Sequence, residues 1–263
     1  MILYFKKWMG IIMIDIHAHF NFDMKNLQGE IDKINESALT AIINPGLDLR
    51  TSREAIDIAN ANEKFFATIG VHPLFEHPEF NFRGDVMRLL RLYDASPNDK
   101  IVAVGETGLD INGNLKAQSI KFIQSIELAN ILELPVMIHA RGTNEQVIEI
   151  LKTYMPQFGF VYRCFHLSEK TAQQIIDMGG FISLIGPATT RDKIDRSFEV
   201  IKEMPLGHLL IENDYPYIDQ RPESEYRDTF NRICELRDLP HSQLQEIVDE
   251  NAQTLFKKLK REY

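Results

Sequence analysis

Two histidines close to the start of the chain have a spacing that suits metal binding. They are His17 and His19, in the segment DIHAH that begins at Asp15. Alternation along an extended strand would place Asp15, His17 and His19 on one side. Two imidazoles two residues apart can both reach one metal ion, but a hydrogen-bonded pair of core histidines has the same spacing. Both interpretations of the pair are therefore open.

Three further residues of metal-ligand type stand next to apolar runs. Glu106 lies in VGETGLD, where its flanking glycines predict a tight turn that projects the carboxylate. His139 ends the run in VMIHAR, and Asp214 follows LLIEN. Taken singly, they have structural alternatives as a turn residue, a buried histidine and an aspartate before a proline. Together with the two histidines they predict a divalent metal site, because nitrogen and carboxylate ligands suit zinc, manganese or iron and carboxylates also accept magnesium.

The elements that must position these residues follow from the apolar runs. Eight short β-type runs alternate with amphipathic helical stretches, such as 116–132 and 242–260. The runs cover residues 11–16, 40–44, 65–70, 101–105, 135–138, 160–165, 181–184 and 208–211. Eight strand–helix units favour an α/β fold, the (β/α)8 TIM-type barrel, with an open doubly wound sheet as the alternative. In a barrel the five candidate ligands would meet at the carboxyl ends of the strands.

Composition limits the class of protein. The chain has 263 residues and a net charge of −9, which argues against nucleic-acid binding by bulk positive charge but not against a nucleic-acid enzyme that carries metal cations. No apolar run reaches the roughly 18 residues of a membrane span. Two distant cysteines, Cys164 and Cys234, suit a reducing compartment such as the cytoplasm. Residues 1–9 are predicted to be an N-terminal extension, not a signal peptide, and residues 10–263 a single barrel.

The order of the motifs resembles the TatD family of metal-dependent deoxyribonucleases, within the amidohydrolase superfamily. The resembling segments are MIDIHAHF at 13–20, GVHP at 70–73, VGETGLD at 104–110, LPVMIHAR at 134–141, LLIENDYPYI at 209–218 and NAQTLF at 251–256. The resemblance implies an amidohydrolase-like barrel, divalent metal ions such as Mg, Mn or Zn, and hydrolysis of DNA phosphodiesters, commonly from the 3′ end.

The resemblance also implies roles for the residues that match. His17 and His19 match ligands of a first metal, Glu106 a glutamate that bridges two metals, and His139 a ligand of the second metal. Asp214 matches the aspartate that binds metal and positions the attacking water. Glu106 and Asp214 are therefore the predicted catalytic residues.

The positions that the resemblance places near the substrate match the family pattern only in part. His72 and Arg141 match substrate-phosphate positions, with a turn residue and a surface salt bridge as their alternatives. Arg163 stands where the family usually has a histidine ligand, and a guanidinium does not ligate a metal. We therefore expect one tight ion, a weak or absent second site, and Arg163 on a substrate phosphate. His166 is a further candidate ligand, which strand parity disfavours.

The leading hypothesis is a metal-dependent 3′–5′ exodeoxyribonuclease with DNA as its substrate, no membrane partner and unidentified protein partners. One alternative is a hydrolase of a small amide or ester on the same frame. A closed apolar pocket would favour that alternative, and an open groove would favour DNA. The other alternative is a non-catalytic subunit of a larger complex, in which Arg163 reflects weakened or lost catalysis.

Overall fold

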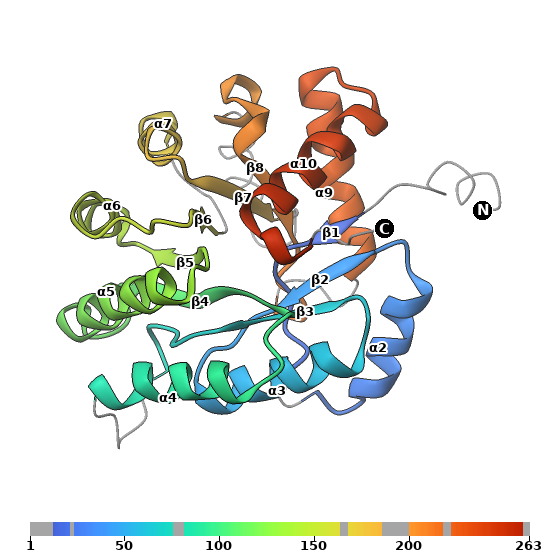
Figure 1. The fold of residues 1–263 in the computed structure, drawn as a ribbon. Helices are drawn as coiled ribbons and strands as arrows, with labels where there is room; N and C mark the ends of the chain where they lie inside the picture. Colours follow the sequence, from blue (N-terminus) through green and yellow to red (C-terminus); the bar gives the residue numbers. More distant parts are fainter. Residues whose placement is uncertain are drawn as a thin grey trace.

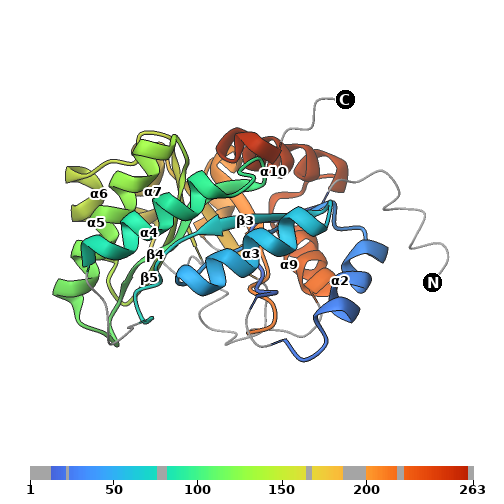
Figure 2. The same cartoon turned by 60° about the horizontal axis from the view of Figure 1, so that its bottom comes forward.

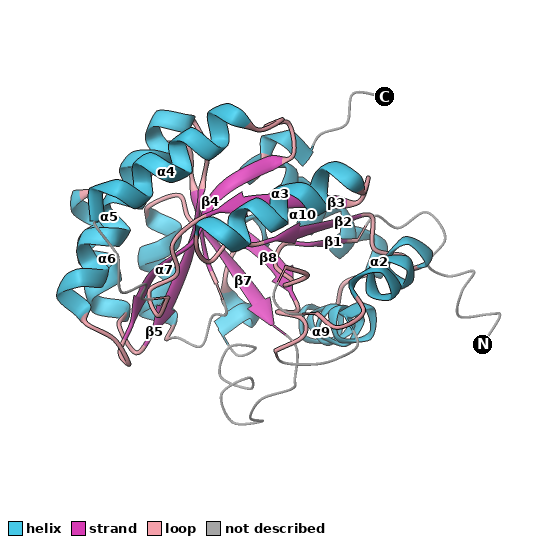
Figure 3. Ribbon diagram, turned by 90° about the horizontal axis from the view of Figure 1, so that it is seen from below, coloured by secondary structure: helices cyan, strands magenta, loops and turns pink. Residues whose placement is uncertain are grey.

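The computed structural model describes residues 13–21, 24–75, 82–163, 168–185, 200–217 and 222–259. Within these ranges eight strands form one sheet, in which neighbours follow chain order and every pair is parallel. The backbone N–H of Ile16 donates to the carbonyl of Ile211 over 3.3 Å, so the sheet curls round until its first and last strands lie side by side. Helices surround the strands (Figures 1 and 3), and the predicted (β/α)8 barrel is confirmed.

All eight predicted strands are present. They are β1 (Ile14–Asp15), β2 (Ala41–Asn44), β3 (Phe65–Ile69), β4 (Ile101–Asp110), β5 (Val136–Arg141), β6 (Phe160–Tyr162), β7 (Phe181–Ile185) and β8 (Leu209–Glu212). The helices are α2 (Leu27–Glu36), α3 (Leu49–Ala61), α4 (Phe82–Ala95), α5 (Leu115–Leu132), α6 (Asn144–Thr153), α7 (Glu169–Asp177), α9 (Pro222–Arg237) and α10 (His241–Leu255), with 3-10 turns η1 (Leu206–His208) and η2 (Lys257–Leu259). The predicted extension at 1–9 lies outside the described residues. None of the described helices is long and apolar enough to cross a membrane.

The fourth strand corrects one expectation about the site. β4 does not end at residue 105 but continues to Asp110, and all ten of its residues are buried. Glu106 therefore lies within a strand and not in a tight turn. The strand continues because β5 is also long, so that Asp110 still pairs with Arg141. A register shift between Val104 and Thr107 marks the place where Glu106 interrupts the regular ladder.

Alternation along the strands divides the buried side chains into two layers. One set packs outward against the helices, and the other fills the inside of the barrel. The inner layer includes Met137 of β5, Val161 of β6 and Leu210 of β8. Residues Ala252, Leu255, Phe256 and Leu259 join this inner cluster from α10 and the segment after it. Other members of the cluster, such as Ala41, Phe66 and Phe181, stand at the starts of strands, so these residues close the amino-terminal end of the barrel. α10 lies along one side of the molecule in Figure 2.

The first prediction concerns Gly70, which follows β3 and lies against β4. A Cβ at this position would lie 2.3 Å from the carbonyl carbon of Gly105 and 2.8 Å from the backbone nitrogen of Glu106. We expect Gly70→Ala to displace Glu106, and overpacking should lower the free energy of unfolding by about 1–3 kcal/mol. Thermal unfolding and calorimetric titration with Mn²⁺ should show both a lower stability and a weaker metal affinity.

Gly207→Ala is the matched control, because a Cβ there would meet no atom within 4 Å. This variant should unfold and bind Mn²⁺ like the unaltered protein. If Gly70→Ala gave the same two results as Gly207→Ala, close packing at Gly70 would not be what positions Glu106.

Candidate metal centre

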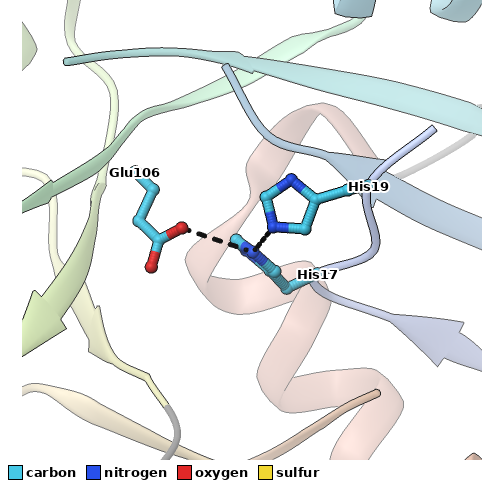
Figure 4. A group of neighbouring side chains, drawn as sticks. All are labelled: His17, His19 and Glu106. Carbon is cyan, nitrogen blue, oxygen red and sulfur yellow. Dashed lines mark hydrogen bonds and ion pairs between the residues drawn. The ribbon is translucent and has the colours of Figure 1, made fainter. Parts of the chain in front are cut away.

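The imidazoles of His17 and His19 meet at the carboxyl-terminal end of the barrel (Figure 4). Their Nε2 atoms lie 3.0 Å apart, and Oδ1 of Asp214 lies 3.3 Å and 3.4 Å from them. Oε2 of Glu106 lies 3.5 Å from Nε2 of His17. Donor atoms around one tetrahedral ion, at bond lengths of about 2.0–2.2 Å, are separated by roughly 3.3–3.6 Å. The separations of Asp214 from both histidines and of Glu106 from His17 match these values, and the two imidazole nitrogens lie slightly closer together.

Backbone contacts fix the two segments that carry these donors. The N–H of Asp214 donates to the carbonyl of His17 over 3.0 Å. Oδ1 of Asp15 accepts the N–H of His17 at 3.1 Å and that of Asn213 at 3.3 Å. β1 ends at Asp15, so the alternation that would have grouped its carboxylate with the two imidazoles does not continue. Asp15 instead ties the histidine segment to the turn that precedes Asp214.

The protonation of the donor set suits a divalent cation. Burial lowers the pKa of His17 to about 3, and the positive charge of Arg163 acts in the same direction, so its imidazole stays neutral and free to ligate. Burial alone would raise the pKa of Glu106 and of Asp214. The guanidinium of Arg163 and the neighbouring histidines outweigh burial and hold the pKa of both carboxyls well below its usual range. Neutral imidazoles and ionised carboxylates are the forms that bind metal ions.

A second group of donors lies on the other side of Glu106. Nδ1 of His139 is 3.0 Å from Oε1 of Glu106 and 3.3 Å from Nε2 of His72. Nε2 of His139 is 3.0 Å from Oδ2 of Asp110. In metal sites a carboxylate commonly orients a ligand histidine through such a contact with its other ring nitrogen. Glu106 thus presents one oxygen to each group, in the manner of a bridging carboxylate.

Arg163, directly after β6, places a cation within this site. Its Nε donates to Oε2 of Glu212 at 2.8 Å, its Nη2 to Oδ1 of Asp214 at 3.0 Å, and its Nη1 to Oε1 of Glu106. The side chain is only 4% exposed. The guanidinium therefore uses the oxygen of Glu106 that faces His139 and the oxygen of Asp214 that faces His17 and His19. Both groups of donors share one carboxylate oxygen with a fixed positive charge, and only the first group keeps a carboxylate oxygen, Oε2 of Glu106, whose described contact is to a histidine.

The structure brings most of the predicted site residues to one end of the barrel. They are His17, His19, His72, Glu106, His139, Arg163 and Asp214. Arg141 is exposed at the tip of β5, beside Asp110 of β4. His166 lies outside the described residues, so its role as a ligand stays a prediction.

Two residues of the site have no assigned role in the sequence interpretation. Asp110 contacts His139, and Glu212 contacts Arg163; the side chains of both carboxylates are fully buried. Side chains two or four residues apart on a strand point to the same face, so the spacing from Glu106 to Asp110 and from Glu212 to Asp214 could have placed both carboxylates in the site. For Asp110 this prediction would have required knowing that β4 extends beyond residue 105.

Comparison with known proteins gives a consistent set of similarities. A family model described as TatD related DNase matches residues 14–257, which include every predicted site residue. YabD, a metal-dependent hydrolase of Bacillus subtilis (strain 168), is 29% identical over 259 residues, covering 94% of this chain and 99% of YabD. The 3′-5′ ssDNA/RNA exonuclease TatD of Pantoea ananatis is 29% identical over 242 residues, which cover 86% of this chain and 91% of the relative. The crystal structure of YjjV, a TatD homologue from Escherichia coli K12, is similar with a TM-score of 0.82 and 27% identity, covering 93% and 98%.

The second prediction concerns the first group of donors. Replacing His17 and His19 together by Ala removes two of its four donor atoms and should abolish metal uptake there. Protein loaded with Mn²⁺ and freed of excess metal by gel filtration would be examined by elemental analysis, with circular dichroism to show that the variant is folded.

His208→Ala serves as the control, because His208 lies just before β8 begins, at the opposite end of the strand from the candidate site. Its Nδ1 is 2.9 Å from the carbonyl oxygen of Gly180. This variant should keep its metal. Unchanged metal content in the folded double variant would mean that the ion is held by other residues.

Proposed function

Because the chain belongs to the TatD-related DNase family of metal-dependent hydrolases, we propose that it cleaves DNA phosphodiester bonds as a 3′–5′ exonuclease. The observation that carries the proposal is the convergence of His17, His19, Glu106 and Asp214 on one point at the strand tips. The name of the Pantoea ananatis relative, a 3′-5′ ssDNA/RNA exonuclease, supports both the substrate class and the direction.

A divalent ion held by His17, His19 and Asp214 would lower the pKa of water towards about 7 and polarise a phosphoryl oxygen. Asp214 orients the attacking water and accepts its proton. The side chain of Asp214 is 20% exposed, which is more than that of His17, His19 or Glu106. It is therefore the donor of the first group that water reaches most easily. Its low pKa keeps it ionised at neutral pH and thus in the basic form.

His72 and Arg141 hold phosphate oxygens in this proposal. Nδ1 of His72 accepts the backbone N–H of Leu74 at 3.2 Å, so the proton of the neutral ring is on Nε2. Burial lowers the pKa of His72 to about 4, and it therefore acts as a neutral hydrogen-bond donor. Arg141 adds a forked, permanent positive charge from the exposed tip of β5. In a chain of net charge −9, these groups and the ion supply the local attraction for a polyanion.

We also propose one tightly bound ion per chain, which is Mg, Mn or Zn. A second ion held by His139 and Glu106 would compete with Arg163, whose Nη1 bonds the oxygen of Glu106 that faces His139. Two like charges about 4 Å apart repel by several kcal/mol at an effective dielectric constant near 20. A substrate phosphate could also reach Arg163, as the sequence predicts, if one of its three carboxylate contacts opened to admit it.

The buried position of Arg163 favours one competing function, a non-catalytic binding subunit. In that case the guanidinium would neutralise Glu106 and Asp214, the two predicted catalytic carboxylates. The nuclease assay below separates the two functions.

The third prediction is that cleavage needs both a divalent ion and Asp214. Metal-loaded protein should release nucleotides from the labelled 3′ end of DNA, and EDTA should stop the release. Asp214→Asn keeps the shape but removes the carboxylate base, so the rate should fall by a factor on the order of 10²–10⁴. The assay would compare single-stranded and double-stranded substrates labelled at either end.

Asp57→Asn is the control, an exposed aspartate of α3 whose replacement should leave the rate unchanged. Full activity in folded Asp214→Asn would remove Asp214 from the mechanism. No cleavage by the metal-loaded unaltered protein would favour the non-catalytic subunit.

A further inference from the structure

Three buried charged side chains and one partly exposed carboxylate lie together at the open end of the barrel. Glu212 is 0% exposed, Glu106 2% and Arg163 4%, and both glutamates contact Arg163. The fourth is the carboxylate of Asp214, also bonded to Arg163. We call these four residues the charge cluster. Three carboxylates and one guanidinium carry a net charge of −3 + 1 = −2, which one divalent ion neutralises and two divalent ions would exceed.

The guanidinium is held from separate parts of the barrel. Glu106 comes from β4, Glu212 ends β8, and Asp214 lies in the turn after β8. Each of the three guanidinium nitrogens has its own carboxylate partner. Arg163 therefore links β6 to β4 on one side and to β8 on the other. A metal ion with ligands from several strands would join those strands in the same way.

Glu212 differs from the other two carboxylates. Glu106 and Asp214 also face the imidazoles of the candidate metal site, whereas Glu212 is bonded to Nε, the guanidinium nitrogen next to the side-chain stem of Arg163. Alternation explains the arrangement, because Val161 and Leu210 of the inner core precede Arg163 and Glu212 by two residues each. The pair thus stands directly above the core of the barrel, where its members are fixed by packing.

We propose that Arg163 is a built-in cation that takes over the charge-balancing role of a second metal ion, and that Glu212 is the positioning residue that holds it in place. The inference deepens the proposed function, since it rests on the same site and on a single catalytic ion. It predicts that the site stays assembled without a second ion, because buried carboxylates need a compensating charge and Arg163 supplies it.

The experiment compares unfolding temperatures of EDTA-treated protein with and without added Mn²⁺. Arg163→Met removes the charge and leaves three buried carboxylates uncompensated, so its metal-free form should unfold at a temperature lower by on the order of 10 °C. Mn²⁺ should restore most of this loss. Arg163→Lys, which keeps a charge, should lose less, and the control Arg53→Met, at an exposed arginine of α3, should match the unaltered protein.

Metal content and a double-mutant cycle complete the test. By elemental analysis the unaltered protein should hold one Mn²⁺ per chain and Arg163→His two, because an imidazole replaces the repelling cation. Arg163→Met and Glu212→Gln should each lower the unfolding temperature, and the double variant should lose less than the sum, since the two residues act as a pair.

Several results would overturn the inference. They are two equally occupied ions in the unaltered protein, a metal-free Arg163→Met as stable as Arg53→Met, or strictly additive effects in the cycle. If Arg163→Met does not fold without metal, refolding with Mn²⁺ decides: recovery supports the inference and continued failure rejects it. None of these measurements uses DNA, so an inactive nuclease assay would remove the proposed function and leave this inference standing.

Discussion

Compensation of buried negative charge is the constraint on which the open end of this barrel depends. Glu106 and Glu212 are almost completely removed from water, and Asp214 is only slightly open to it. Carboxylates in such places are stable only when a cation contacts them. Arg163 contacts all three, and it keeps Glu106 and Asp214 ionised against the effect of burial. Oδ1 of Asp214, which contacts Arg163, also faces His17, and Glu106 turns its other oxygen, Oε2, towards the same imidazole. The ionised carboxylates that Arg163 stabilises are therefore also the ones that could hold a divalent ion.

Strand alternation, which builds the core, also delivers the site. Met137 packs inside the barrel and the side chain two residues later is His139; Val161 precedes Arg163 in the same way. The inner face of β5 and of β6 is therefore apolar along its buried length and polar at its tip. α10 and the segment after it close the amino-terminal end with apolar side chains. Polar chemistry is thus confined to the carboxyl ends of the strands, where barrel enzymes have their active sites.

Much of this arrangement could be predicted from the sequence, because runs of buried strand residues and the residues that follow them are local features. The eight strands and the convergence of His17, His19 and Asp214 were accessible in this way. The length of β4 was not, since glycines beside Glu106 suggest a turn, and only pairing with a long β5 keeps the strand extended. The partners of Arg163 were also inaccessible. Glu106 and Glu212 lie 57 and 49 residues away along the chain, and only closure of the barrel brings them together.

We propose that one divalent ion and one guanidinium share the work that two metal ions would otherwise perform. A crystal structure of Mn²⁺-loaded protein, with anomalous scattering used to locate the metal, would show how many ions bind and where Arg163 lies. We expect one fully occupied anomalous peak at roughly 2.0–2.3 Å from the imidazoles of His17 and His19. The guanidinium of Arg163 should stay bonded to Glu106 and Glu212. Two peaks of equal height, with the guanidinium turned away from both glutamates, would show that Arg163 does not replace an ion.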